Sequence, residues 1–251
     1  MTFDAILLIV IGAFSGGFIS GLAGFGTGLF ALGWWLAAMP VSDAVVLVVI
    51  MSLVGGVQGL YAVRNAVDLR LLVRFLVPAL IGIAIGYRML DHINIIVLKL
   101  VLATLLILFG GFFTFRKTLP KLTMHFLSMD ITVGGIGGVL AVLAGLSGAL
   151  LTMWCSLYDW TKAQRRGVIQ PFNMIILSIV FVLMMGRGLV TVDIVLLVAV
   201  ALPSSVLGTQ AGIASFRRLS DDQFQKLLIW LTLVSGLTLA GRELIARLLA
   251  G

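Results

Sequence analysis

The chain has 251 residues, of which 61% are hydrophobic and 11% are charged. A soluble globular domain carries about 25% charged residues, so this composition excludes that class and predicts a helical membrane protein. The net charge of +7 does not indicate nucleic acid binding, because the lysines and arginines fall in short loops, as is typical of the cytoplasmic loops of membrane proteins. The single cysteine, Cys155, excludes an intrachain disulfide and a cysteine-based metal cluster.

The first apolar segment, residues 5–39, is the longest and contains a glycine-rich break at 23–28. One straight helix of this length would measure roughly 50 Å, against a hydrocarbon core of about 30 Å, and two full crossings would need about 40 residues. The break and the length together predict a broken re-entrant hairpin, which returns to the side from which it enters. Three further apolar segments follow, at 44–63, 71–90 and 94–115.

A linker at 116–130, predicted to be cytoplasmic, precedes a second set of apolar segments at 131–156, 168–186, 190–214 and 224–249. Segment 131–156 carries a second glycine-rich break at 144–149. The break predicts a second re-entrant hairpin, whereas the length alone also fits a single tilted helix.

The two sets of segments match each other beyond their breaks. Gly16 and Gly17 recur 121 residues later as Gly137 and Gly138. Further pairs lie 125 or 126 residues apart: Asp68 and Asp193, Pro78 and Pro203, Gly82 and Gly208, Gly86 and Gly212, Gly110 and Gly236. These ordered matches predict an internal repeat, with a first copy at 1–115 and a second at 131–251. The alternative is chance agreement between two glycine-rich bundles.

The distribution of basic residues predicts how the two copies are oriented. If all eight segments crossed the membrane, the two faces would carry nine and seven basic residues, which is no bias. If both hairpins return to their own side, twelve basic residues share one face and four share the other. We therefore expect an all-α polytopic membrane protein of two inverted repeats, each a broken re-entrant helical hairpin followed by three transmembrane helices. Both termini are then extracytoplasmic.

The break at 23–28 (AGFGTG), its weaker copy at 144–149 (AGLSGA) and the glycines near the ends of the repeats resemble the TauE/SafE family of anion exporters. The resemblance covers almost the whole chain. It implies a membrane carrier for a small sulfur-containing anion, such as sulfite, sulfoacetate or another organosulfonate, with no metal and no cofactor. The second copy departs from the first at four of its six positions, so we expect the site between the two breaks to be asymmetric.

Re-entrant hairpins place the N-termini of half-helices near the middle of the membrane, where unpaired N–H groups carry about half a positive charge. A sulfite or sulfonate oxygen can bind these groups, and glycine permits its close approach. We expect the two breaks to hold the anion through Gly24, Phe25, Gly26, Thr27, Leu146, Ser147 and Gly148. Close helix packing is the competing interpretation of such glycines.

Polar side chains inside the apolar segments are further candidates for the site. Gln170 and Asn173 lie early in the sixth segment, and Asn173 corresponds to Ser52 at the 121-residue offset. Gln58 and Gln210 are similar candidates. An amide can donate an N–H to an anion while it carries no charge, and an interhelical hydrogen bond is the alternative role for each residue.

The sequence thus predicts a secondary transporter, not an enzyme, which exports its anion across a bacterial inner (plasma) membrane by alternating access. An anion channel with the same fold is the main alternative, and a membrane scaffold without transport is another. A serine protease at Ser147 is disfavoured, because both histidines, His92 and His125, lie at loops before that serine. The expected partners are the anionic substrate and the lipid bilayer, without nucleic acid. A homodimer, the direction of transport and the coupling ion are left open.

Overall fold

The computed structural model describes residues 3–89, 126–144 and 147–250, together with a few residues between 103 and 114. The described residues form helices joined by turns: α1 (Phe3–Ala23), α2 (Thr27–Trp35), α3 (Val41–Val63), η1 (Arg64–Ala66), α4 (Leu69–Met89), α6 (Leu127–Ala144), α7 (Ala149–Cys155), α8 (Lys162–Gly186), α9 (Val192–Arg218) and α10 (Asp221–Ala250). The all-α architecture predicted from composition is confirmed.

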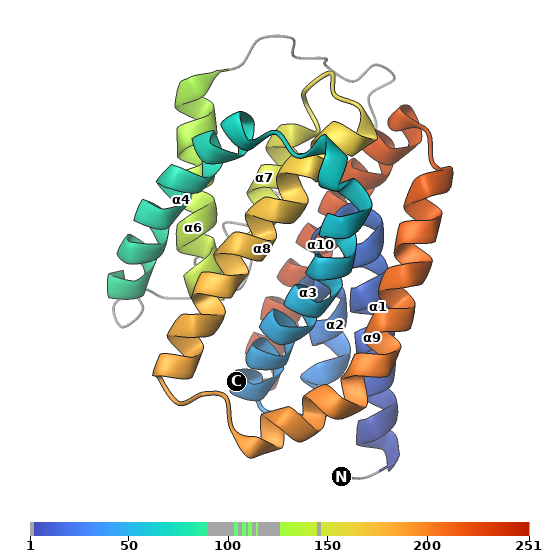
Figure 1. Cartoon of the computed structure of the whole chain (residues 1–251). Coiled ribbons are helices and arrows are strands. Elements are labelled where there is room, and N and C mark those ends of the chain that lie inside the picture. The colour runs from blue at the N-terminus through green and yellow to red at the C-terminus, as the bar shows by residue number, and fades with distance from the viewer. Residues whose placement is uncertain are drawn as a thin grey trace.

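Five of these helical stretches are long and apolar enough to cross a membrane: Phe3–Ala23, Ser42–Ala66, Leu69–Met89, Lys162–Gly186 and Val192–Arg218. The long helices lie side by side in one bundle, with the two marked chain ends toward the same end of it (Figure 1). This arrangement, together with the length and hydropathy of the helices, agrees with a polytopic membrane protein. Most of the predicted segment 94–115 and most of the linker lie outside the described residues.

The short helix α2 folds back along α1 and forms a hairpin with it. The indole Nε1 of Trp35, at the end of α2, donates a buried hydrogen bond of 3.0 Å to the carbonyl oxygen of Ile9. Gly16 of α1 faces the first two turns of α2, where a Cβ at Gly16 would lie 3.0 Å from both the Ala31 Cβ and the Thr27 carbonyl oxygen. The glycine therefore lets the two helices approach closely.

The short helix α7 returns along α6 in the same manner. The indole Nε1 of Trp154, near the end of α7, donates a hydrogen bond of 2.7 Å to Asp130 Oδ1 in the first turn of α6. The Tyr158 hydroxyl donates to the same oxygen at 3.3 Å. Burial and the neighbouring Asp130 raise the pKa of Tyr158 to about 12, so the phenol keeps its proton at neutral pH.

Two pairs of long helices pack with their backbones in contact, and glycines make this possible. In the α1–α9 pair, a Cβ at Gly17 would collide with the Ser205 carbonyl oxygen. In the α4–α6 pair, a Cβ at Gly138 would collide with the Ala79 carbonyl oxygen. Close backbone approach through small residues is how helices associate in lipid, where the hydrophobic effect supplies no drive between them.

Helix α8 begins at Lys162, six residues before the predicted start of its segment at 168. A capping box explains the early start: Thr161 accepts a hydrogen bond from the Gln164 backbone N–H, and the Gln164 side chain accepts one from the Thr161 N–H. As a result Arg165 and Arg166, expected in a loop, lie inside α8 and are buried. The loop placement of these two arginines was wrong.

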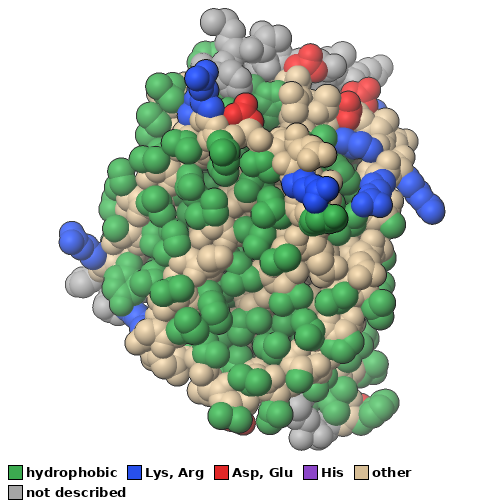
Figure 2. All heavy atoms as spheres, in the orientation of Figure 1, with side chains coloured by type: hydrophobic (Ala, Val, Ile, Leu, Met, Phe, Trp, Pro, Cys, Tyr) green, Lys and Arg blue, Asp and Glu red, His purple; other side chains and the backbone are tan. Residues whose placement is uncertain are grey.

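Exposed basic side chains gather at one end of the bundle, which we call the basic end (Figure 2). They come from the end of α3 and η1, the starts of α4 and α10, and the end of α9: Arg64, Arg70, Arg217, Arg218 and Lys226. The half-buried Lys162 at the start of α8 lies at the same end. In Figure 1 the marked N- and C-termini lie toward the opposite end. Hydrophobic side chains are spread over the whole visible surface between the two ends, interspersed with uncharged side chains and backbone, which suits a lipid-facing surface.

Candidate functional site

A cavity lies where the tips of the two hairpins meet α3 and α8. Eight of the eleven residues proposed from the sequence line it: Gly24, Phe25, Gly26, Thr27, Ser147, Gly148, Gln170 and Asn173. Seven others complete the lining: Ser20, Gly28, Leu29, Ser52, Ala149, Met174 and Leu177. The empty space between them, including its opening, is about 470 Å³. The part of it that the centre of a water molecule can occupy is about 40 Å³, which is room for about three water molecules.

The first hairpin turns at two glycines in the left-handed region of backbone conformation. Gly24 has a φ of 85° and Gly26 a φ of 96°. Side chains other than glycine are strained by such values, which explains why the chain reverses at this glycine-rich break. Helix α2 then begins at Thr27, with Gly26 at its N-cap and no side chain capping it.

The bare N-terminus of α2 faces the cavity. The Phe30 N–H is the first to bond back, to the Gly26 carbonyl oxygen at 3.3 Å. The N–H groups of Thr27, Gly28 and Leu29 therefore precede the first intrahelical bond, and all three residues line the cavity. The partial positive charge of a helix N-terminus is directed at this space.

The second hairpin contributes Ser147 and Gly148 to the cavity, while Gly145 and the proposed site residue Leu146 lie outside the described residues. Gly148 is the N-cap of α7 and has a right-handed φ of −93°. Helix α7 has seven residues, against nine in α2. The two tips therefore differ in backbone conformation and in helix length, as well as in sequence.

Asn173 of α8 joins the two tips through its side chain. The Ser147 hydroxyl donates to Asn173 Oδ1 at 2.8 Å, and Asn173 Nδ2 donates to the Gly24 carbonyl oxygen at 3.0 Å. Both bonds are buried. A single amide thus satisfies one polar group on each hairpin and connects segments that are 149 and 26 residues away in the chain.

Gln170 lies one turn before Asn173 and is 1% exposed. Its Nε2 donates to the Gly56 carbonyl oxygen of α3 at 3.3 Å, whereas its Oε1 is buried without a hydrogen-bond partner among the described residues. A Cβ at Gly59 would lie 2.5 Å from this Oε1. Glycines on α3 therefore make room for the Gln170 amide beside the cavity.

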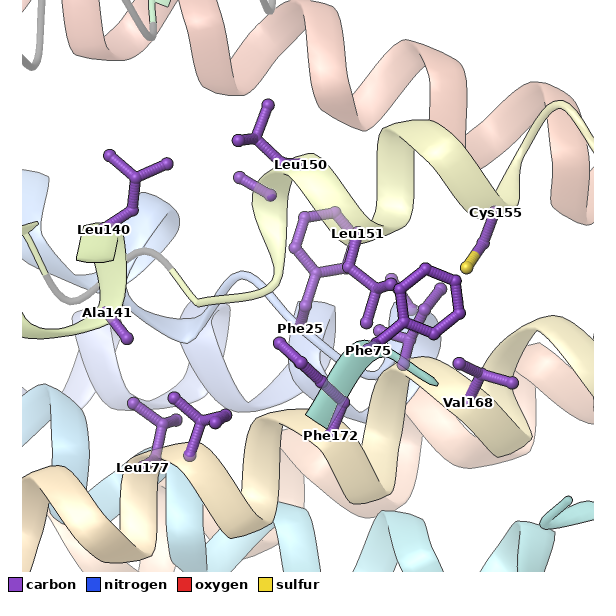
Figure 3. Close-up of a cluster of buried hydrophobic side chains, with 14 of the residues drawn as sticks. Phe25, Phe75, Leu140, Ala141, Leu150, Leu151, Cys155, Val168, Phe172 and Leu177 are labelled. Carbon is purple, nitrogen blue, oxygen red and sulfur yellow. The ribbon is translucent and has the colours of Figure 1, made fainter. Parts of the chain in front are cut away.

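The Phe25 ring anchors the first tip rather than offering a polar contact. It lies within a buried hydrophobic cluster and, in Figure 3, is directed toward Leu151 of α7, with Phe75 of α4 and Phe172 of α8 nearby. This packing holds the first hairpin tip against the second hairpin. Phe25 therefore belongs both to this cluster and to the lining of the cavity.

The structure does not bring Gln58 and Gln210 to the cavity. They line a separate, mostly apolar groove between α3 and α9, together with Tyr61 and Arg217 among others. Sequence reasoning did not propose Ser20 and Ser52 for the site. Ser52 had a usable signal, since it is the counterpart of Asn173 at the 121-residue offset, and both line the same cavity.

Among the described residues, the cavity lining has polar side chains but no charged one. Its positive potential comes from the N-terminus of α2, and its hydrogen-bonding groups are the hydroxyls of Ser20, Thr27, Ser52 and Ser147 and the two amides. Among the described residues, histidine, cysteine, aspartate and glutamate form no group of three or more that could hold a metal ion. The described lining is suited to a small anion that accepts hydrogen bonds.

A family-level comparison matches residues 8–239 with the family described as Sulfite exporter TauE/SafE. The chain belongs to this family. Comparisons with curated proteins and with solved structures gave no match. Membership of this family makes the protein a transmembrane transport protein of the sulfite-exporter type, which agrees with the long apolar helices.

Proposed function

We propose that this TauE/SafE protein is a secondary transporter that exports a small sulfur-containing anion, such as sulfite, sulfoacetate or another organosulfonate, across a bacterial inner membrane by alternating access. The observation that carries the proposal is the cavity between the two hairpin tips. It combines the bare N-terminus of α2 with the Ser147 hydroxyl and the Asn173 amide, which touches both tips.

The chemistry of this lining suits a sulfur oxyanion. Three oxygens of a sulfite or sulfonate group can accept hydrogen bonds from the first N–H groups of α2, and Thr27 and Ser147 add hydroxyl donors from opposite tips. Because these donors are neutral, the bound anion makes no ion pair at the tips. Binding is then weak enough for release on the other side of the membrane, as transport requires.

Contacts between the long helices support an inverted repeat. A Cβ at Gly208 of α9 would meet the Phe14 carbonyl oxygen of α1, and a Cβ at Gly82 of α4 would meet the Gly135 carbonyl oxygen of α6. Gly82 and Gly208 are 126 residues apart, and Phe14 and Gly135 are 121 residues apart, which are the offsets of the repeat. The same contact is therefore made once in each half of the repeat. In Figure 1 α1 runs upward and its counterpart α6 downward, and α3 and α8 are likewise opposed. Inverted repeats with broken helices are a known architecture of secondary transporters.

The positive-inside rule supports an orientation with the basic end in the cytoplasm. Arg64 and Arg70 lie at this end, as do the last residues of α9, Arg217 and Arg218. Both marked termini lie toward the other end in Figure 1, and the proposed orientation therefore has them outside the cytoplasm.

Flux of labelled sulfite and labelled sulfoacetate in proteoliposomes tests the proposed function. We expect concentrative or trans-accelerated flux for the wild type, and its loss in Gly26→Leu and in Ser147→Leu, with both variants still inserted. Gly33→Leu is the control, because nothing lies within 4 Å of a Cβ at Gly33. Normal flux in both tip variants would refute the site. Flux without trans-acceleration would indicate a channel, and no anion-dependent flux or stabilisation would indicate a scaffold.

A further inference from the structure

Arg166 is a buried cation beside the first hairpin tip. It lies in the second turn of α8 and is 0% exposed. None of its three guanidinium nitrogens, Nε, Nη1 and Nη2, has a hydrogen-bond partner among the described residues. The contact that the guanidinium does make is with the Phe216 ring of α9, whose centroid lies 4.5 Å from Cζ.

This environment is unusual for an arginine. A buried charge is normally paired or hydrogen-bonded, because the loss of hydration is otherwise uncompensated. The neighbouring Arg165 shows the ordinary solution, since its Nη2 donates to the Tyr158 carbonyl oxygen at 3.0 Å. A face-on aromatic contact stabilises the Arg166 cation but leaves its N–H donors unused. The five N–H groups of Arg166 therefore need acceptors that the described protein does not supply.

The position of Arg166 relates it to the cavity. A Cβ at Gly24 would lie 3.3 Å from Arg166 Cγ, 3.7 Å from Arg166 Nε and 3.0 Å from Gln170 Oε1. Arg166, Gln170 and Asn173 are spaced i, i+4 and i+7, so they share one face of α8 over about 10 Å. Along this face a cation at the basic end is followed by two amides that line the cavity.

We propose that Arg166 forms a second subsite for the transported anion, on the basic-end side of the hairpin tips and separate from the cavity lining. The proposal rests on the proposed function. A guanidinium presents parallel N–H donors that match two oxygens of a sulfite, sulfonate or carboxylate group. The charge of Arg166 draws the anion in from the basic end, and the neutral donors at the tips receive it next. In the conformation described, the subsite is closed to solvent, as alternating access requires of one of its states.

The test compares the wild type with Arg166→Gln, Arg166→Lys and Arg218→Gln in detergent. Arg218→Gln is the matched control, because it removes an exposed arginine at the same end of the bundle. The measurements are the thermal midpoint with and without sodium sulfite or sulfoacetate, and equilibrium binding of the same labelled anions. Sodium gluconate keeps the ionic strength constant.

We expect Arg166→Gln to bind at least about tenfold more weakly, because charge-assisted hydrogen bonds are lost, and to lose the anion-dependent rise in thermal midpoint. Without anion its midpoint should equal or exceed that of the wild type, because the variant no longer buries an unpaired charge. A merely structural arginine would instead give a lower midpoint without anion. Arg218→Gln should behave like the wild type in both measurements.

Wild-type affinity in Arg166→Gln would overturn the subsite and leave the proposed function standing. Absence of binding to the wild type itself would overturn both, so the two failures are distinguishable. If Arg166→Gln does not fold, Arg166→Lys carries the test. A buried lysine loses its charge more readily than arginine, so sulfoacetate binding by Arg166→Lys should weaken as the pH rises from 7 to 9 or be weak throughout. Wild-type affinity over that range would overturn the subsite.

Discussion

Replacing Asn173 by leucine tests whether one amide holds the two hairpin tips together. The substitution keeps the approximate size of the side chain and removes both buried hydrogen bonds, to Ser147 and to the Gly24 carbonyl oxygen. Each group left without a partner destabilises a protein by about 1–3 kcal/mol. Because both groups border a cavity that water can enter, the lower part of that range applies. We expect a loss of about 2–3 kcal/mol in total.

For a chain of this length the loss corresponds to a fall in thermal midpoint of roughly 4–12 °C. The assay is thermal unfolding in detergent, with Ser178→Ala as the control, since the Ser178 hydroxyl is exposed and bonds only within α8. Ser147→Ala should lower stability by about 1 kcal/mol. The double variant Ser147→Ala/Asn173→Leu should lose less than the sum of the two single losses, because the Ser147 hydroxyl that Asn173→Leu alone leaves unpaired is absent from it. An unchanged midpoint in Asn173→Leu, or strict additivity in the double variant, would refute the role of the amide.

Three further predictions address packing and orientation. Gly17→Ala should destabilise the protein by about 1–3 kcal/mol, because its Cβ would collide with the Ser205 carbonyl oxygen of α9. Gly33→Ala is the control and should not destabilise it, because nothing lies within 4 Å of a Cβ at Gly33. Equal thermal midpoints for the two variants would contradict the helix contact. Trp35→Phe should lower stability by about 1 kcal/mol, since the Ile9 carbonyl oxygen loses its buried donor, and an unaltered melting curve would argue against that bond. Alkaline phosphatase fused to either terminus should be active, and a reporter that fluoresces only in the cytoplasm should give no fluorescence when fused to the same positions. The reverse pattern at either end would overturn the orientation.

The glycine-rich break of the first hairpin could be predicted from sequence because a helix in lipid has few reasons to contain several glycines together. The structure places α1 before that break and α2 after it, with Gly24 and Gly26 in the left-handed conformation between them. Asn173 could be proposed because polar side chains in apolar segments are rare. Its contact with both tips could not, since it depends on how three distant segments pack.

Sequence reasoning failed where a helix's start or rotation decided the outcome. Arg166 resembled a loop residue because two arginines precede an apolar run, yet a capping box at Thr161 starts α8 early and carries Arg166 inside. Gln58 and Gln210 were proposed from composition, but the rotation of α3 and α9 turns them toward a separate groove. The capping box is a local pattern that Thr161 and Gln164 already show in the sequence. The rotation of α3 and α9 depends instead on tertiary contacts that periodicity does not encode.

The unequal hairpin tips make a last prediction about their glycines. Gly148 has a right-handed φ of −93°, so alanine there is limited only by space: its Cβ would lie 2.6 Å from both Asn173 Nδ2 and Oδ1. Gly26 has a φ of 96°, where alanine is strained by about 1–2 kcal/mol whatever surrounds it. Asn173→Ser, which copies the repeat counterpart Ser52, shortens the obstructing side chain. It should therefore restore the thermal midpoint of Gly148→Ala toward that of Asn173→Ser alone.

Asn173→Ser should not restore the thermal midpoint of Gly26→Ala, because no change in a neighbouring side chain relieves backbone strain at Gly26. Thermal midpoints of the three single variants and the two double variants, measured in one detergent, decide between the two causes. Rescue of both alanine variants would show that crowding limits both tips alike, and rescue of neither would show that Gly148 also needs its backbone freedom. Either result would remove the physical basis for treating the two half-sites as different.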